Sequence, residues 1–104
     1  MANKIPPKTR EKVYERAWFK CEICNSISGL QIHHITGRHS HRLENLMLLC
    51  WNCHHGTKGV HGKKGRELDL RLKRDLQHHY KDQGYSEDKI RQLMGGKLYK
   101  EVKV

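Results

Sequence analysis

The sequence predicts a small α+β domain that is stapled by a structural zinc ion. Its four cysteines form two Cys-x-x-Cys pairs, and short apolar runs typical of strands are followed by amphipathic segments typical of helices. With 104 residues, of which 36% are hydrophobic, the chain has room for one domain with a modest core. A domain of this size and polarity usually needs disulfides or a metal for its stability.

The cysteine pairs favour a metal over disulfides. Two residues between cysteines let a tight turn direct both sulfurs at one ion, and four thiolates complete a tetrahedral zinc site. Because Met1–Arg10 lacks the apolar segment of a signal peptide, we expect a cytoplasmic protein, in which free thiols bind metal. A site with four protein ligands is closed to substrate, so this zinc is structural. Its predicted ligands are Cys21, Cys24, Cys50 and Cys53.

One helix is predicted before the first cysteine. Residues 1–9 form a basic lead that we expect to be mobile, and Thr9 can cap a helix over residues 10–19. Four residues of this helix form one apolar stripe, which should pack on the rest of the domain: Val13, Tyr14, Ala17 and Trp18.

Two short strands follow between the cysteine pairs. The first covers residues 30–35, and it places His33 and His34 on opposite faces because neighbouring side chains alternate along a strand. A polar and basic loop over residues 36–44 leads to the second strand, Leu46–Leu49.

Helices are predicted for the remainder of the chain. One can start near Asn52, and a stronger one covers residues 66–81, where leucines recur every four residues, until Gly84 stops it. Ser86 caps a last helix with an acidic first turn, which is favourable near the positive end of the helix dipole. Beyond the mobile lead, the chain thus divides into a core with the zinc site, a helical extension of the same domain and a charged tail: residues 10–65, 66–96 and 97–104.

Charge indicates a polyanionic partner. The 21 Lys and Arg residues exceed the 11 Asp and Glu residues, which gives a formal net charge of +10. Nucleic acid is the commonest partner of so basic a domain, although a basic surface can also serve solubility alone. No apolar run approaches the length of a membrane-spanning helix, so no membrane partner is expected.

Histidines are concentrated between the two cysteine pairs and just after the second pair. Most of the nine histidines lie in this region: His33, His34, His39, His41, His54, His55 and His61. Neutral imidazoles are good ligands for divalent metals, and an uncoordinated one titrates near neutral pH, as a general base should. We therefore expect a second metal site with a base beside it.

These residues resemble the signature of the HNH endonucleases. The resemblance lies in His33-His34-Ile35, in Asn45-Leu46 and in the run from Leu49 to His54, and the basic helix before Cys21 resembles the zinc-stapled branch of that family. It covers roughly residues 10–62 and implies a ββα-metal fold, in which a hairpin and a helix hold a catalytic divalent ion.

The resemblance also implies a role for each matching residue. His33 would bind the catalytic metal, His34 would be the general base that takes a proton from water, and Asn45 would orient His34 or its strand. His54 would be a metal ligand on the helix. A second ligand one helical turn after His54 would be Lys58, which cannot bind a metal when it is protonated. His61 is therefore preferred to complete the site, and His55 is the weaker candidate.

The implied function is metal-dependent hydrolysis of DNA phosphodiester bonds, leaving a 5′ phosphate and a 3′ hydroxyl. One catalytic ion cuts one strand, so a monomer should nick. Imidazole ligands suit zinc, nickel or manganese, and the family is also active with magnesium. Phosphate contacts are expected from the inter-strand loop and from the segment after the active site: Arg38, His39, His41, Arg42, Lys58, Lys63 and Lys64. The helix after them offers Arg71, Lys73 and Arg74, for which a solvated face is an equally good explanation.

Two other functions stay open at this point. One is a non-catalytic zinc-ribbon module that binds nucleic acid, although such a ribbon does not require His34 and Asn45. The other is an HNH subunit that acts with a partner protein such as a phage terminase, to which the helices after Gly65 could dock. The chain is expected to be a monomer or a weak dimer.

Overall fold

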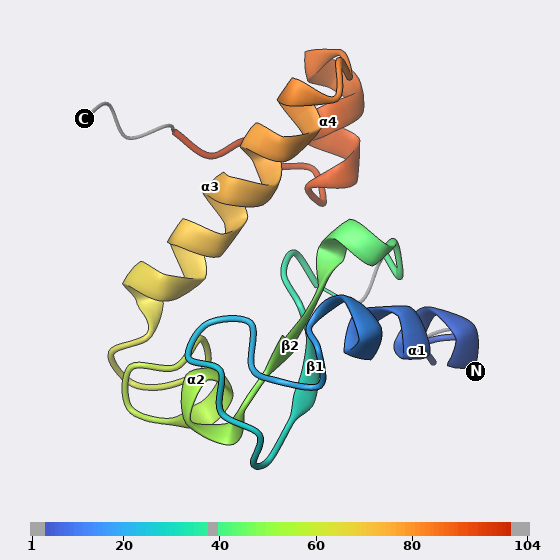
Figure 1. Ribbon diagram of the computed structural model, residues 1–104. Coiled ribbons are helices and arrows are strands. Elements are labelled where there is room, and N and C mark those ends of the chain that lie inside the picture. The colour runs from blue at the N-terminus through green and yellow to red at the C-terminus, as the bar shows by residue number, and fades with distance from the viewer. Residues whose placement is uncertain (1–3, 38–39, 101–104) are drawn as a thin grey trace.

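A hairpin with a short helix forms the centre of the molecule, as a computed structural model that describes residues 4–37 and 40–100 shows (Figure 1). The predicted α+β class is confirmed, and the adjacent β1, β2 and α2 give the ββα order of the predicted core. In chain order the elements are α1 (Pro7–Arg16), β1 (Gln31–His34), η1 (Leu43–Asn45), β2 (Leu46–Leu49), α2 (Trp51–His55), α3 (Arg66–Asp82) and α4 (Glu87–Leu93). No helix in these two ranges is long and apolar enough to span a membrane.

The hairpin determines where the histidines lie. β1 and β2 pair in antiparallel register, with Gln31 opposite Leu49 and His34 opposite Leu46. Leu46 and Leu48 are buried because the face of β2 that they share packs against α1. His33 is only 4% exposed, whereas His34 on the other face is half-buried.

The first helix differs from its prediction at both ends. It begins at Pro7, since the fixed φ of proline suits the first turn of a helix, and Thr9 is not its cap. It ends at Arg16, because Trp18 and Phe19 adopt the left-handed conformation with φ of 57° and 56°. The prediction that Trp18 belongs to the buried stripe is therefore wrong, and Trp18 is 81% exposed.

An ion pair ties α1 to the hairpin. The Arg16 guanidinium donates to the carbonyl oxygens of Leu43 and Leu46, at 3.0 and 2.6 Å, and pairs with the Glu22 carboxylate at 2.7 Å. Glu22 in turn accepts from the Leu48 N–H at 3.2 Å. The turn that carries the first two cysteines is thereby held against β2.

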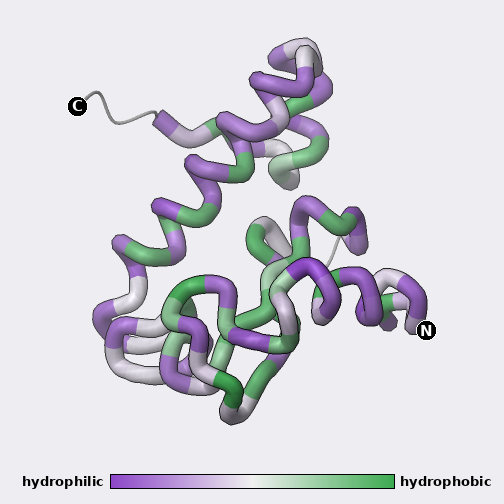
Figure 2. The backbone as a smooth tube through the Cα atoms, in the orientation of Figure 1, coloured by the Kyte–Doolittle hydropathy of each residue, from purple (hydrophilic) through white to green (hydrophobic). Residues whose placement is uncertain are grey.

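The two C-terminal helices complete the main core. Leu72, Leu76 and Tyr80 of α3 are buried against Ile90, Leu93 and Met94, in one cluster with Cys21, Ile35 and Leu49. Figure 2 shows hydrophobic positions recurring between hydrophilic ones along α3. As predicted, Ser86 caps α4, and its hydroxyl accepts from the Lys89 N–H at 3.2 Å.

The described part of the predicted tail lies against α3. The Gln77 side chain donates to the Tyr99 carbonyl and accepts from the Tyr99 N–H, both at 2.7 Å. Leu98 and Tyr99 also pack on the main core, which a purely charged tail would not do.

Between α2 and α3 the chain returns on itself through residues 56–65, which we call the glycine segment. Gly56, Gly59, Gly62 and Gly65 are spaced three apart, and each of the last three donates its N–H to the carbonyl of the glycine before it, at 2.8–3.1 Å. A Cβ on Gly62 would lie 1.8 Å from the Gly56 oxygen, and one on Gly65 would lie 1.6 Å from the Gly59 oxygen. Only glycine permits this close backbone approach.

Gly62→Ala is therefore expected to lower the free energy of unfolding by about 1–3 kcal/mol, because the added methyl group overpacks a turn whose backbone cannot move freely. Urea unfolding followed by circular dichroism measures the change. Lys63→Ala, at the exposed neighbouring position, is the matched control and should change stability by less than about 0.5 kcal/mol. Equal stability of the two variants would contradict the close-approach argument.

Candidate metal centres

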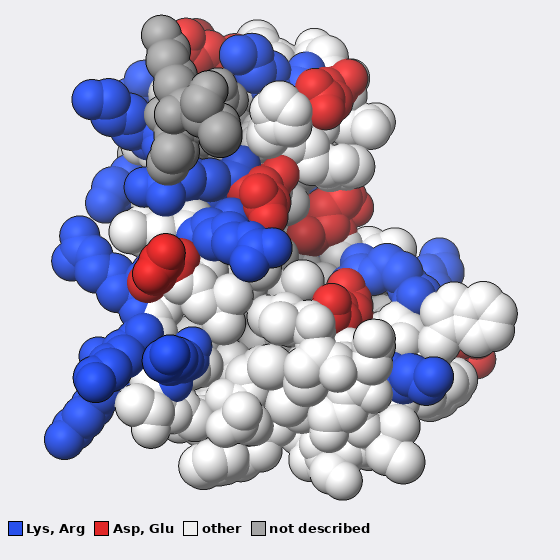
Figure 3. Space-filling view, turned by 60° about the vertical axis from the view of Figure 1, so that its left-hand side comes forward, with Lys and Arg blue, Asp and Glu red and all other residues white. Residues whose placement is uncertain are grey.

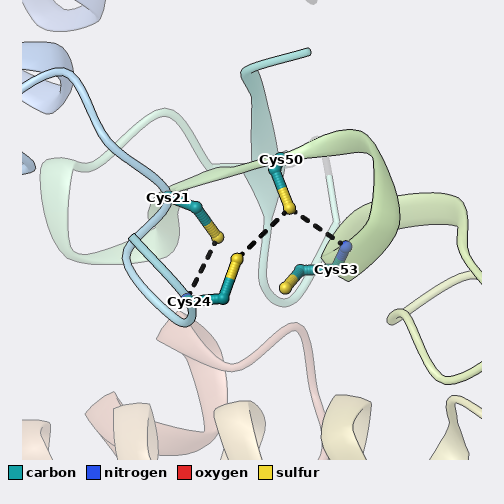
Figure 4. Close-up of side chains that lie close together, drawn as sticks. All are labelled: Cys21, Cys24, Cys50 and Cys53. Atoms are coloured by element: carbon teal, nitrogen blue, oxygen red, sulfur yellow. Dashed lines mark hydrogen bonds between the residues drawn. The ribbon is translucent and has the colours of Figure 1, made fainter. Parts of the chain in front are cut away.

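The four predicted zinc ligands converge on one point. Their Sγ atoms all lie within 4.8 Å of one another, although the two pairs come from distant parts of the chain (Figure 4). All four are free thiols, and the Sγ atoms of Cys24 and Cys50 are 3.5 Å apart, far beyond a disulfide bond of about 2.05 Å. This geometry could hold a zinc ion.

Backbone groups around Cys21 favour its thiolate. The N–H groups of Ile23 and Cys24 donate to Cys21 Sγ at 3.4 and 3.5 Å. Burial alone would raise the pKa of Cys21, but these and other backbone hydrogen bonds outweigh it and lower the pKa to about 7. Burial and the neighbouring thiols raise the pKa of Cys53, so four thiolates need a cation between them.

One cysteine links this cluster to the helix that follows. Cys50 is the N-cap of α2, and its Sγ accepts from the Cys53 N–H at 3.4 Å. Since α2 also carries His54, the cysteine cluster determines the position of that histidine relative to β1.

A second group of potential ligands lies across the hairpin. The ring nitrogens of His33, His54 and His61 lie within 4.8 Å of one another. The ring centroids are 5.2 Å apart for His33 and His54, 5.0 Å for His33 and His61, and 4.8 Å for His54 and His61. β1, α2 and the glycine segment each contribute one of these rings.

The chemistry of these rings fits a divalent metal ion. His33 Nε2 is buried without a hydrogen-bond partner in the described structure, which is costly unless an ion accepts its lone pair. Burial first, and then the nearby rings of His54 and His61, lower the pKa of His33 to about 3. Burial and the neighbouring histidines likewise lower the pKa of His54 to about 4, so both rings are neutral at pH 7, as ligands must be.

A glutamine orients one of these ligands. His54 Nδ1 lies 2.7 Å from Gln31 Oε1. Because a carbonyl oxygen only accepts, Nδ1 carries the proton and Nε2 keeps the lone pair that a metal would use. Outer contacts of this kind commonly orient metal-binding histidines.

The glycine segment explains how His61 reaches the cluster. The N–H groups of Val60 and His61 donate to the carbonyls of Cys53 and His54, both at 2.9 Å, so the chain folds back over the end of α2. Lys58, one helical turn after His54, is exposed on the intervening turn. The His55 ring stacks near His61 at 5.4 Å and 30°, and it is outside the group of three.

His34 lies beside this cluster, in contact with another histidine. His34 Nε2 is 3.1 Å from His41 Nδ1. Both His33 and His34 line an open pocket of about 530 Å³ together with the rings of His54, His55 and His61. The pocket is thus lined by three potential ligands and by two further imidazoles, those of His34 and His55.

Asn45 holds the loop that follows His34. It is fully buried, and its Oδ1 accepts from the N–H and the hydroxyl of Thr36 at 2.9 and 2.8 Å. Its Nδ2 donates to the carbonyls of Gly37 and Ser40, at 3.1 and 2.9 Å. Asn45 therefore closes the loop that runs from β1 to His41.

The predicted DNA-contacting residues have different surroundings. Lys58, Lys63 and Lys64 are exposed, and Figure 3 shows Lys and Arg side chains gathered over α3 and the segment before it. Arg42, in contrast, pairs with Glu44 at 3.2 Å and donates to the Tyr85 hydroxyl at 3.1 Å, which ties the loop to the C-terminal helices. Arg38 and His39 lie outside the described residues.

Sequence reasoning missed Gln31 and the contact of His41. Gln31 precedes the histidines by only two residues, but a lone glutamine at the edge of a strand gives no signal without the position of His54. The sequence also did not decide whether Lys73 contacts phosphate or only solvent. In the structure Lys73 pairs with Asp69 at 2.9 Å, and both line a smaller pocket together with His33 and His34.

The comparisons agree with this geometry. Residues 21–58 match the family described as HNH endonuclease, and this stretch contains both cysteine pairs together with His33 and His54. Neither the curated proteins nor the solved structures gave a significant match. Residues 21–58 of the chain are thus similar to HNH endonuclease domains, and the clustered cysteines are consistent with a zinc-binding variant of such a domain.

Proposed function

We propose that this protein is a cytoplasmic, metal-dependent endonuclease that nicks DNA. The observation that carries the proposal is the orphaned, buried Nε2 of His33 within a group of three imidazoles, beside His34 in the same pocket. A structural zinc held by the four cysteines would keep this pocket together, whereas His33, His54 and His61 would hold the catalytic ion. Candidates for that ion are Mg²⁺, Mn²⁺, Ni²⁺ and Zn²⁺.

The protein's own residues supply the proton transfer. If His34 Nε2 donates to His41 Nδ1, then His34 Nδ1 carries the lone pair that takes a proton from the attacking water. Attack of the water oxygen on phosphorus breaks the bond to the 3′ oxygen, which leaves with the bonding electron pair and takes a proton from solvent, so the products carry a 5′ phosphate and a 3′ hydroxyl. A bound divalent ion would supply charge stabilisation at the phosphate. Asn45 would act as a positioning residue, because it holds the loop between His34 and His41.

A plasmid assay tests the proposal. Supercoiled DNA incubated with the zinc-loaded protein and each of the four ions should become open-circular, and the ends at the nick should be ligatable. A plasmid that stays supercoiled with every ion would overturn the catalytic proposal. The second candidate would then apply, a zinc-ribbon module that binds nucleic acid without cutting it, which the HNH domain and the basic surface also favour.

Phosphate contacts are proposed for the exposed lysines of the glycine segment. Changing both Lys63 and Lys64 to Gln should weaken binding to every DNA sequence alike, and should reduce the slope of log K against log salt by about 2. Binding to a labelled duplex is measured by anisotropy over a series of salt concentrations. Changing the exposed Lys8 and Lys12 of α1 to Gln removes the same charge and should leave the slope nearer to wild type. An equal reduction in both variants would show that only net charge matters.

The C-terminal helices leave room for a protein partner. Since α3 and α4 lie beyond the matched domain, we propose that an HNH subunit of this layout can also act with a partner such as a phage terminase. One catalytic site cuts one strand, so the monomer should nick, and double-strand cleavage would require a dimer or two events. Analytical ultracentrifugation beside the plasmid assay distinguishes these cases.

A further inference from the structure

We propose that Trp51 and His55 form a stacking subsite for an unpaired nucleobase of the strand that is cut. The inference rests on the proposed nuclease function and deepens it, because it names the class of DNA that the site prefers. That class is DNA with an unpaired base beside the scissile phosphate, as in a gap, a bulge or a single-stranded region.

The first observation is the exposure of Trp51. It is the first residue of α2, and 57% of its surface is exposed. Its backbone and Cβ lie against the turn at Gly29, since a Cβ built on Gly29 would lie 3.2 Å from the Trp51 Cβ. The side chain is therefore fixed at its base, while a large apolar ring faces solvent, where it costs free energy unless a ligand covers it.

The second observation is a row of rings that leads from Trp51 to the metal ligands. The centroids of Trp51 and His55 are 6.2 Å apart at 45°, and those of His55 and His61 are 5.4 Å apart at 30°. His55 also lines the pocket that contains His33 and His34. A nucleotide whose phosphate lies in this pocket therefore has aromatic faces within reach of its base.

The chemistry of these rings selects a base in preference to a phosphate. An indole carries no charge and offers a phosphate only a single N–H donor, whereas its whole ring face stacks on the π face of any base. In a duplex both faces of each base are already covered by neighbours, and exposing one costs a few kcal/mol. Only a base that is already unpaired can use Trp51 without this cost.

The only other tryptophan of the chain provides a matched control. Trp18 is even more exposed, at 81%, and neither indole lines the histidine pockets themselves, but Trp51 lies beside His55, which does line the larger pocket. Trp18→Phe leaves Trp51 as the single indole, and Trp51→Phe leaves Trp18. Each fluorophore can thus be followed alone.

The test titrates both variants, each combined with His34→Ala so that DNA is bound without being cut. The ligands are a duplex, the same duplex with a short gap, and the single strand. Trp51 fluorescence should be quenched by gapped and single-stranded DNA and little changed by the duplex, while Trp18 should respond to none. Trp51→Ala should weaken binding to gapped DNA roughly five- to hundredfold and leave binding to the duplex unchanged.

Equal quenching by duplex and gapped DNA, or no quenching of Trp51, would overturn the inference, and the exposed ring would then be free for a protein partner. The plasmid assay separates this failure from that of the proposed function. If wild type nicks plasmid while Trp51 is unquenched, the subsite is wrong and the nuclease stands. If Trp51 is quenched as expected and no ion supports cleavage, the subsite belongs to a binding module instead.

Discussion

Replacing His34 with alanine is expected to lower the rate of plasmid nicking by about 10²- to 10⁴-fold, the usual contribution of a general base. His34 lines the pocket of the three clustered imidazoles but does not belong to that cluster, so its removal should leave metal binding intact. The measurement is the initial rate of open-circle formation at saturating metal. Equal rates for His34→Ala and wild type would exclude His34 as the base.

Two comparisons make this result specific. His79→Ala removes an exposed histidine of α3 that lies outside both histidine pockets, and it should nick like wild type. His41→Ala should cause a smaller loss than His34→Ala, because His41 only orients the base through the 3.1 Å contact. Thermal unfolding of each variant should match wild type, so that a loss of rate reports on chemistry and not on folding.

Local sequence patterns predicted the elements whose signals are strong. The continuous apolar run Leu46–Leu49 forms β2 with the predicted bounds, and Ser86 caps α4 as its hydroxyl chemistry indicates. The first helix was predicted less well. Its end depends on two left-handed residues, Trp18 and Phe19, and bulky side chains adopt that conformation only where the surrounding structure imposes it.

The candidate site shows a similar division between local and tertiary information. The placement of His33 and His34 on opposite faces of β1 followed from the predicted strand, because a two-residue period needs no tertiary knowledge. The arrival of His61 depends on glycines that allow the backbone to double back onto the end of α2, which the spacing of ligands along a helix cannot describe. Gln31 and His41 gain their contacts only through the hairpin and the buried side chain of Asn45.

Replacing Cys50 with serine is expected to unfold the domain rather than to weaken one site. Cys50 would be a zinc ligand and is buried in the main core, so the substitution removes a thiolate ligand and leaves a hydroxyl among apolar side chains, while the serine oxygen can still cap α2. Binding of a structural zinc contributes about 10–16 kcal/mol in small domains, which equals or exceeds the whole stability of a typical domain of about 5–15 kcal/mol. Loss of the ion should therefore abolish the cooperative unfolding transition.

Metal analysis and circular dichroism together test this expectation, and a second variant separates the two metal centres. His54→Ala removes a proposed ligand of the catalytic ion but leaves all four thiols, so it should retain one zinc per chain and a cooperative transition while losing activity. If Cys50→Ser instead keeps zinc and unfolds like wild type, the cysteine cluster does not hold the fold together. Because α2 runs from the cysteine cluster to the histidine cluster, Cys50→Ser should lose both the fold around the zinc and the geometry of the histidine pocket, whereas His54→Ala should lose only the second.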